Sequence, residues 1–356
     1  MKGVILHGGH GTRLRPLTHT GPKQLIPVAN KPMSQYALED LRDSGVNDIA
    51  IVVGDSLSNK VQNYYKNGQE FGVRTTYIHQ KQPNGIAHAI SLAEDFVGDS
   101  PFIVYLGDNL LKGKIAEFVK VFKESNFDAM ILLCKVKNPQ RFGVAKFDKS
   151  GNLLELVEKP KEPPSNYALT GIYFLKPIIF KIIKGLKPSW RGELEITEAL
   201  QGLLDSGHPI GYKFVTGWWK DTGTVEDILE ANRLVLDDIK KEAEGIIEEN
   251  TSIQGRVTIG KETIIRRGAL IRGPAIIGRS TVVEKHVFVG PYTSIGNNVK
   301  IKRGEIENSI IMDGCQIEIN GKITDSLIGA GTTLTTNQRS PKGCRLVVGE
   351  NSRIVL

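Results

Sequence analysis

The sequence has 356 residues and a formal net charge of +7, with 46 Lys and Arg against 39 Asp and Glu. This length allows two domains, and the charged fraction of 24% is ordinary for a globular protein. Basic residues are spread along the chain and form no dense block beside aromatic residues, so we expect no nucleic-acid partner. An anionic small substrate explains the positive charge equally well, and a solvated basic surface is the competing interpretation.

The cysteines and the hydropathy pattern limit the possible compartment. Cys134, Cys315 and Cys344 are far apart and form no paired motif, so they predict neither a disulfide framework nor a zinc site. No apolar stretch approaches the ~18 residues of a membrane span, and the N-terminus lacks a signal-peptide layout. We therefore expect a cytoplasmic protein without a membrane partner.

The N-terminus combines a strand with a glycine-rich turn. The apolar run Gly3–Leu6 is suited to a buried strand. It passes directly into a cluster with the glycines Gly8, Gly9 and Gly11 and the cations Arg13, Arg15 and Lys23. Glycines after a strand let backbone amides approach phosphate oxygens. The pattern predicts a polyphosphate site, and a turn that serves only the fold is the alternative.

Short apolar runs alternate with amphipathic segments from residue 1 to about residue 235. The expected strands are 3–6, 49–53, 75–79, 102–106, 129–136, 142–147, 153–157 and 168–175, with a strand pair at 212–215 and 218–220. The expected helices are 33–44, 59–66, 86–96, 115–124, 177–184, 195–204 and 224–239. This alternation predicts an α/β domain over residues 1–239, with a mainly parallel sheet and helices on both faces. Ligands of such sheets bind beyond the carboxyl ends of the strands, here after Leu6, Val53, His79 and Leu106.

A different pattern begins after the polar segment 240–250, which we expect to be a linker. Apolar residues recur at every sixth position: Ile253, Ile259, Ile265, Ile271, Ile277, Val283, Val289, Ile295 and Ile301. Steps of six would scatter these side chains around an α-helix, whereas in an extended chain they all face one way. Residues 251–356 are therefore expected to form a second domain of short extended segments.

Two long strings carry a family resemblance. G-G-x-G-T-R-L-R-P-L-T starts at Gly8, and P-K-Q-L-I-P-V-A-N-K-P-M starts at Pro22. They resemble the opening of the sugar-nucleotide pyrophosphorylases, and within these the long form of the glucose-1-phosphate thymidylyltransferases. The resemblance covers nearly all of the chain. It implies a Rossmann-like nucleotidyltransferase domain with a mixed, mainly parallel sheet, then a left-handed parallel β-helix of hexapeptide repeats. Such coils commonly pack against copies of themselves, so we expect a homo-oligomer.

The resemblance also implies a reaction and a set of residues. Glucose 1-phosphate would attack the α-phosphorus of dTTP and expel pyrophosphate, with Mg²⁺ as cofactor. The implied catalytic residues are Arg13 and Lys23, and the implied metal ligands are Asp108 and Asp221. The implied nucleotide-binding residues are Gly8, Gly9, Gly11, Thr12, Arg13, Gln24, Gln80 and Gly85. The implied sugar-phosphate-binding residues are Gly143, Glu158, Lys159, Thr170 and Gly171, with Glu195 as a weaker candidate.

Several alternatives stay open at this point. UTP could replace dTTP, because small shifts in loop backbone can exclude or admit the 2′-hydroxyl of the nucleotide. The C-terminal domain could be an acyltransferase that uses His286, or the chain could be a catalytically silent regulatory subunit. His7 stands where the family usually has alanine, and we expect His7 and His10 to be non-catalytic loop residues that line the nucleotide site.

Overall fold

The computed structural model describes residues 1–9, 11–54 and 57–336. The chain folds into two compact units, neither of which is continuous in sequence. The first unit contains Met1–His10, Gly21–Leu25 and Met33–Asp221. The second contains Gly11–Thr20, Ile26–Pro32 and Thr222–Leu356. The chain therefore changes unit four times between His10 and Met33, within the glycine- and cation-rich segment.

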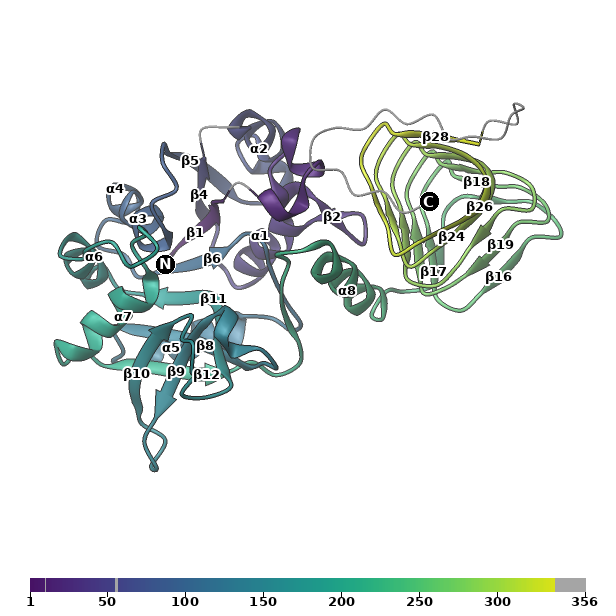
Figure 1. The fold of residues 1–356 in the computed structure, drawn as a ribbon. Helices are drawn as coiled ribbons and strands as arrows, with labels where there is room; N and C mark the ends of the chain where they lie inside the picture. The colour runs from purple at the N-terminus through teal and green to yellow at the C-terminus, as the bar shows by residue number, and fades with distance from the viewer. Residues whose placement is uncertain (10, 55–56, 337–356) are drawn as a thin grey trace. The chain divides into compact units, whose positions relative to one another are not determined.

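A mixed nine-stranded sheet forms the centre of the first unit (Figure 1). Its strands are β1 (Lys2–His7), β4 (Asp48–Gly54), β5 (Arg74–Gln80), β6 (Phe102–Leu106), β8 (Ala129–Lys135), β9 (Gly143–Phe147), β10 (Leu153–Glu158), β11 (Tyr167–Leu175) and β12 (Ile210–Phe214). The order is β10-β9-β11-β6-β1-β4-β5, with β8 beside β11 and β12 beside β8. Strands β6, β1, β4 and β5 run parallel, so their carboxyl ends share one edge. The predicted Rossmann-like sheet is confirmed.

Helices cover both faces of this sheet, because its strands are apolar on both sides. One face packs against α1 (Met33–Asp43), α2 (Ser58–Tyr65) and α5 (Ala116–Glu124). The other packs against α3 (Ile86–Ser91), α4 (Glu94–Val97), α6 (Ile178–Lys184) and α7 (Ile196–Asp205). Side chains of β1 point alternately into the two cores. Ile5 lies in the core on the side of α1, α2 and α5, and Val4 lies in the core on the side of α3, α4, α6 and α7.

Two predictions for this unit were wrong in detail. The helix expected over residues 86–96 is broken into α3 and α4, and the Ala93 amide bonds the carbonyl of Ile90 in a tighter, 3₁₀-type turn. The strands expected to pair near residues 212–220 do not pair with each other. Strand β12 lies parallel to β8, whereas β13 (Trp219–Asp221) lies antiparallel to β7 (Asn109–Leu111). The β7–β13 pairing places Asp221 opposite Asn109.

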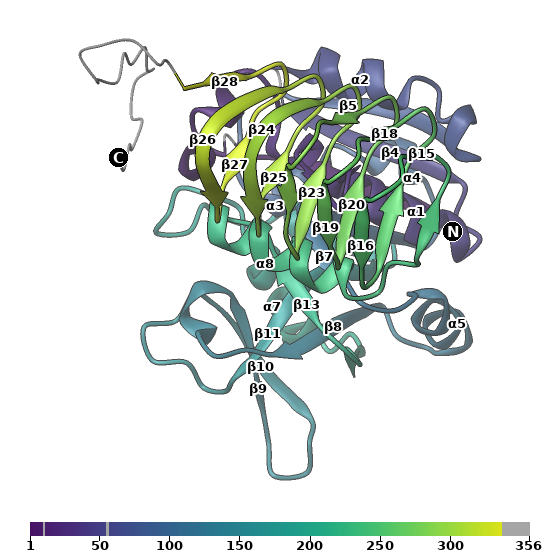
Figure 2. The same ribbon diagram turned by 90° about the vertical axis from the view of Figure 1, so that its right-hand side faces the viewer.

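Short parallel strands build most of the second unit (Figure 2). They are β14 (Glu242–Ala243), β15 (Ile246–Ile247), β16 (Ser252–Gln254), β17 (Val257–Ile259), β18 (Ile264–Ile265), β19 (Leu270–Arg272), β20 (Ala275–Ile277), β21 (Val282–Val283), β22 (Phe288–Val289), β23 (Thr293–Ile295), β24 (Lys300–Glu307), β25 (Ile310–Ile311), β26 (Gln316–Thr324), β27 (Leu327–Ile328) and β28 (Thr333–Thr335). We call residues 242–335 the parallel-strand domain. Val257 pairs with Ala275, and Ala275 with Thr293, so the chain returns to the same side after 18 residues.

The apolar residues at six-residue steps face one interior, as predicted. From Ile259 to Ile301 each is at most 1% exposed, and all of them belong to one core. The segment expected to be a linker, 240–250, instead contains β14 and β15, which pair with β17 and β18. Residues 337–356 of the predicted domain, including Cys344, lie outside the described residues.

Among the residues that the structure describes, the rest of the second unit consists of helix α8, a hairpin and two short 3₁₀ segments. Helix α8 (Val225–Leu236) begins at Thr224, whose hydroxyl accepts the Asp227 amide as an N-cap. The hairpin joins β2 (Pro27–Val28) to β3 (Lys31–Pro32).

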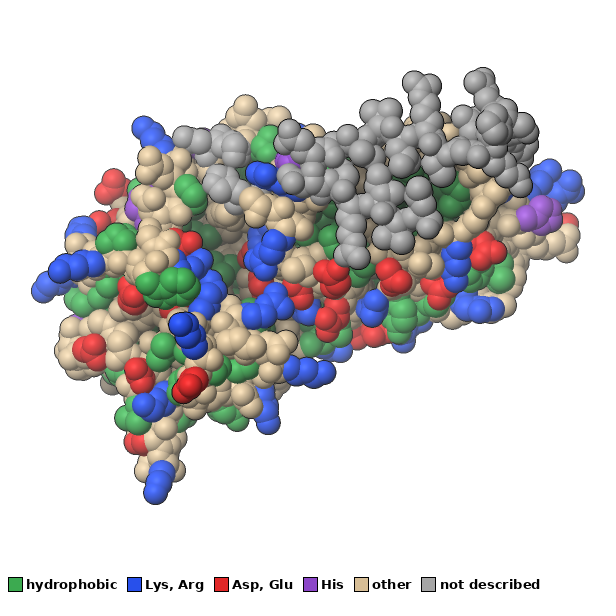
Figure 3. Space-filling view, viewed as in Figure 1, with side chains coloured by type: hydrophobic (Ala, Val, Ile, Leu, Met, Phe, Trp, Pro, Cys, Tyr) green, Lys and Arg blue, Asp and Glu red, His purple; other side chains and the backbone are tan. Residues whose placement is uncertain are grey.

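On the face drawn in Figure 3, basic and acidic side chains are interspersed. No helix within the described ranges is long and apolar enough to span a bilayer.

Inward-facing and outward-facing residues alternate along β20, which gives a matched test of packing in the parallel-strand domain. We expect Ile277→Ala to lower the free energy of unfolding by about 2–5 kcal/mol, because it leaves a cavity in the core. Ile276, on the opposite face of the same strand, is only partly buried, so Ile276→Ala should cost less than about 1 kcal/mol. Chemical denaturation of both variants measures the difference, and equal losses would contradict this packing.

Candidate active site

A cavity of about 310 Å³ opens at the carboxyl-end edge of the first unit's sheet. Its lining from strand ends includes Gly8, Gly9, Gln80, Gly85 and Asp108. Its lining from the opposite side includes Glu158, Lys159, Arg191, Glu193 and Glu195. The loops after Leu6, His79 and Leu106 therefore contribute to one cavity, as the topology predicted. The structure brings together predicted nucleotide, metal and sugar-phosphate residues from distant parts of the sequence.

An ion pair between Lys23 and Asp108 lies at this edge. Lys23 is on a 3₁₀ turn, Lys23–Leu25, and Asp108 directly follows β6; their side chains are only 12% and 16% exposed. Burial by itself would raise the pKa of Asp108, but the charge and hydrogen bond of Lys23, with a further bond from Asn109, lower that pKa below its usual range. Asp108 is therefore a carboxylate at neutral pH.

Gln24 supports the glycine turn. Its Nε2 donates to the Gly8 carbonyl at 2.8 Å, and its backbone carbonyl accepts the Ser34 hydroxyl at 3.1 Å. The side chain is almost fully buried, and Gln24 is not among the residues that line the cavity. In this structure Gln24 holds the backbone of the turn in place.

Gln80 and Gly85 form the loop that follows β5. The Gln80 Nε2 lies 2.9 Å from the His88 Nδ1 and 3.3 Å from the Gly85 carbonyl, and these contacts fix the amide. Gly85 has a φ of 103°, and a Cβ there would lie 2.5 Å from the Leu194 carbonyl oxygen. Only glycine fits this approach. Sequence reasoning missed His88 and Leu194, because their contacts depend on the tertiary fold.

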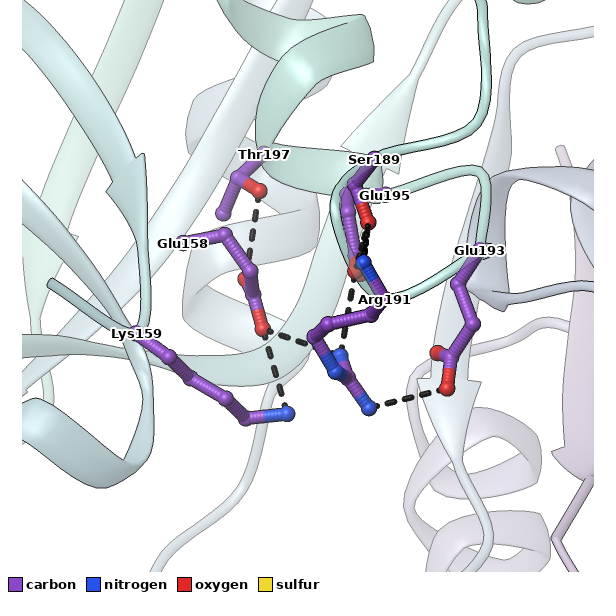
Figure 4. A network of polar contacts seen from close by, with 7 residues as sticks. All are labelled: Glu158, Lys159, Ser189, Arg191, Glu193, Glu195 and Thr197. Atoms are coloured by element: carbon purple, nitrogen blue, oxygen red, sulfur yellow. Dashed lines mark hydrogen bonds and ion pairs between the residues drawn. The ribbon is translucent and has the colours of Figure 1, made fainter.

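Glu158 is the centre of a polar network on the other side of the cavity (Figure 4). Its carboxylate accepts the Thr197 hydroxyl at 3.1 Å and pairs with the Lys159 ammonium at 3.3 Å. The Arg191 guanidinium lies 3.7 Å from Glu158 and bonds Glu193 at 2.9 Å and Glu195 at 3.1 Å. Two cations and three carboxylates thus share one region, suited to a ligand that carries both hydroxyls and phosphate.

Arg191 and Glu195 were underestimated in the sequence. Arg191 has no predicted role there, although it opens a string, Arg191–Thr197, that resembles one in the family. Burial raises the pKa of Glu195, and the nearby charge of Glu158 raises it further, against the opposing effect of Ser189 and Arg191. Carboxylates this close to one another need a cation between them, and Arg191 supplies it.

Among the other predicted sugar residues, Gly143 contacts this network, whereas Gly171 and Thr170 contact β6 and β8. A Cβ on Gly143 would lie 2.5 Å from Thr197 Cγ2 and 3.2 Å from Glu158 Oε2, so a glycine is needed there. Gly171 packs against Leu106, where a Cβ would come within 2.7 Å of the side chain. Thr170 is fully buried and donates its hydroxyl to the Leu132 carbonyl, so its hydroxyl bonds the sheet backbone.

Asp108 and Asp221 have the chemistry of a magnesium site. Asp108 is an ionised carboxylate, and Asp221 pairs across the β7–β13 ladder with Asn109, its neighbour in sequence. The described residues contain no cluster of three or more His, Cys, Asp or Glu side chains placed to hold a metal. Mg²⁺ does not need one, because it usually takes one or two carboxylates together with substrate phosphates. The residues present fit such an ion.

Three predicted nucleotide residues belong to the second unit. Gly11 precedes a 3₁₀ turn, Thr12–Leu14, which carries Thr12 and Arg13 on the surface. The Thr18 hydroxyl donates to the Gly11 carbonyl at 2.8 Å and closes this segment on itself. The convergence of Arg13 with Asp108 stays a prediction.

His7 differs from its predicted place in a loop. It is the last residue of β1, 4% exposed, with its ring edge-on to Tyr65. Burial lowers the pKa of His7 to about 3, although the charge of Asp108 opposes this. A neutral imidazole adds no positive charge for a triphosphate, in agreement with the non-catalytic role we expected. His10 lies outside the described residues.

Comparison with known proteins agrees with this geometry. The family model for nucleotidyl transferases matches residues 2–238. The chain belongs to the nucleotidyl transferase family. A second model, the GMPPB C-terminal domain, matches residues 271–355 of this nucleotidyl transferase.

Relatives of this nucleotidyl transferase share its full length. The low-salt glycan biosynthesis nucleotidyltransferase Agl11 of Haloferax volcanii is 52% identical, with 100% of both chains covered. A glucose-1-phosphate thymidylyltransferase of Streptomyces griseus is 42% identical over 99% of each chain. A Bacillus anthracis structure, described as a glucose-1-phosphate thymidylyltransferase in complex with a sucrose, matches with a TM-score of 0.64 and 43% identity, covering 67% of this chain and 96% of that one. The protein is a sugar nucleotidyltransferase.

The buried ion pair predicts a pH-dependent loss of stability. Because the pKa of Asp108 is lowered in the folded state, the pair contributes stability above the unfolded pKa, about 4, and loses it as the pH falls through the folded value. Lys23→Met should therefore cost roughly 3–5 kcal/mol at pH 7, since it removes the cation beside the buried Asp108 carboxylate. The cost should shrink as the pH falls below about 4.

Denaturation at pH 7 and at pH 3.5 measures this dependence. The control is Lys181→Met, which changes an exposed lysine of α6 and should have little effect at either pH. If Lys23→Met lowers the free energy of unfolding by the same amount at both pH values, the stabilising role of the Lys23–Asp108 ion pair would be contradicted.

Proposed function

We propose that the protein joins glucose 1-phosphate to dTTP, giving dTDP-glucose and pyrophosphate. One observation carries this proposal: a single cavity is lined both by Gly8, Gln80 and Asp108 and by Glu158 and Arg191. The first group suits a nucleoside triphosphate and the second suits a sugar phosphate. The likeness to thymidylyltransferases at 42% identity supports the choice of nucleotide and sugar.

The reaction needs charge control more than acid–base catalysis. An oxygen of the sugar phosphate forms a bond to the α-phosphorus, and the bond from that phosphorus to the bridging oxygen breaks, with its electron pair leaving on pyrophosphate. The nucleophile is already an anion, so no general base is required. Positioning two polyanions and neutralising charge on the α-phosphate are the main tasks.

Each residue has a part in these tasks. Glu158 accepts hydrogen bonds from the sugar hydroxyls, and Lys159 and Arg191 hold the sugar phosphate. Lys23 and Arg13 neutralise the triphosphate. Asp108 and Asp221 would hold Mg²⁺, which supplies charge neutralisation at the reacting phosphates.

The Gln80 amide gives the base its recognition group. Its Nε2 contacts His88 and Gly85, and these contacts fix its orientation, so the amide would offer its Oε1 as an acceptor for the N–H on the edge of a pyrimidine. This feature accommodates thymine and uracil alike, so UTP is the alternative nucleotide.

The second unit would be a left-handed β-helix through which a cytoplasmic homo-oligomer assembles. Parallel pairing at intervals of 18 residues and one apolar interior support a coil with three strands per turn. We do not propose an acyltransferase, because His286 is an exposed turn residue with a φ of 61°.

Pyrophosphate release tests the proposal directly. Purified enzyme with Mg²⁺ is given dTTP or UTP against a panel of sugar 1-phosphates, with Asp108→Asn as the inactive control. We expect the highest kcat/KM with dTTP and glucose 1-phosphate. A preference for UTP would replace the nucleotide in this proposal, and no release with any pair would overturn the reaction.

Arg13 gives a second test with a matched arginine control. Arg13→Ala should lower kcat by roughly 10²–10⁴, because it removes a donor that stabilises charge on the triphosphate. Arg74 is exposed at the first residue of β5, the end of the strand away from Gln80, so Arg74→Ala should keep near-normal turnover. Similar activities of the two variants would refute the role of Arg13.

A further inference from the structure

The two segments that flank Lys23 and Gln24 in the sequence belong to the second unit. Gly11–Thr20 precedes these residues and Ile26–Pro32 follows them, and both group with residues 222–356. Lys23 and Gln24 themselves belong to the first unit, where they contact Asp108 and Gly8. The backbone that carries Lys23 is thus covalently attached at both ends to parts of the other unit.

The segment after Lys23 is a hairpin fixed at its turn. Ala29 and Asn30 both have left-handed backbone, with φ of 47° and 62°, as a tight two-residue hairpin turn requires. The Asn30 Nδ2 donates to the carbonyl of Ile295 at 2.6 Å, and the Ala29 amide donates to Asn232 Oδ1 at 2.8 Å. The turn is therefore bonded both to β23 of the parallel-strand domain and to α8.

Asn232 binds the same strand with its remaining groups. It is fully buried on α8; its Oδ1 also accepts the Ser294 hydroxyl at 2.7 Å, and its Nδ2 donates to the Tyr292 carbonyl at 3.1 Å. A buried amide whose donor and acceptor are both used resists displacement, because losing a partner leaves a buried polar group unsatisfied. Hydrogen bonds therefore connect the hairpin, α8 and β23 in one network.

The segment before Lys23 also meets the parallel-strand domain. A Cβ built on Gly329 would lie 3.1 Å from Leu17 Cδ2, so Leu17 packs directly over this glycine. The bond from Thr18 to Gly11 ties the rest of that segment together. Arg13 lies between these two residues on the same segment.

We propose that the parallel-strand domain fixes the position of the triphosphate-binding segment around Lys23, and that Asn30 is a positioning residue through which the domain acts. By holding the segments on either side of Lys23, the domain sets where Lys23 and Gln24 can lie. This inference rests on the proposed role of Lys23 toward the triphosphate. The sugar-phosphate residues Glu158 and Arg191 lie far along the chain from these segments and need no such support.

The test is Asn30→Gly, which removes the side-chain bond to Ile295 and keeps a residue that accepts left-handed backbone. Asn30→Asp is the second variant, since it keeps the size of the side chain but cannot donate. We expect both to raise the KM for the triphosphate about 3- to 10-fold, the worth of one lost hydrogen bond. The KM for the sugar 1-phosphate should stay within about twofold of wild type.

The matched control is Asn298→Gly in the parallel-strand domain. Asn298 has a φ of 55°, close to that of Asn30, but lies exposed in a turn that bonds Arg279. It should change neither KM. An unchanged triphosphate KM in both Asn30 variants, or an equal rise in both KM values, would overturn the inference. Absence of activity in wild type would instead overturn the proposed function.

Discussion

The buried ion pair between Lys23 and Asp108 is the contact on which the rest of the site depends. It joins the glycine- and cation-rich segment to the carboxyl end of β6, and it keeps Asp108 ionised in a place where burial alone would favour the neutral acid. Neither residue could be held there alone, because an unpaired buried charge is costly. The pair therefore places a cation and a carboxylate at one edge of the sheet, as the proposed phosphate and metal roles require.

The side of the cavity that contains Glu158 follows the same principle with more charged groups. Glu158, Glu193 and Glu195 surround Arg191, and Lys159 completes the group. Carboxylates bind hydroxyls and the two cations bind phosphate, so one network can hold both parts of a sugar phosphate. The network is assembled from the end of β10 and the loop before α7, so its two groups of residues are more than thirty positions apart in the sequence.

Local patterns in the sequence were enough to predict the elements but not all of their contacts. The strand before Gly8 and the burial of Ile259 to Ile301 follow from periodicity, and both were predicted. Asp108 could be placed because it ends an apolar strand of a parallel sheet. Arg191 could not, because nothing in its neighbourhood shows that Glu158 lies beside it.

Some boundaries of segments and units could not be predicted from the sequence, for the same reason. The segment 240–250 is polar and reads as a linker, yet its strands pair with partners 16 to 18 residues later. The assignment of Gly11–Thr20 and Ile26–Pro32 to the second unit depends on contacts with residues more than 200 positions away. Long-range contacts of this kind leave no periodic signal in a single sequence.

A structure of the enzyme with bound dTDP-glucose and Mg²⁺ is the sharpest test of this site. We predict sugar hydroxyls on Glu158, phosphate oxygens on Lys159 and Arg191, the base at Gln80 and the metal on Asp108 and Asp221. Product bound outside this cavity, or bound in it with Asp108 and Arg191 facing neither phosphate nor metal, would overturn these assignments.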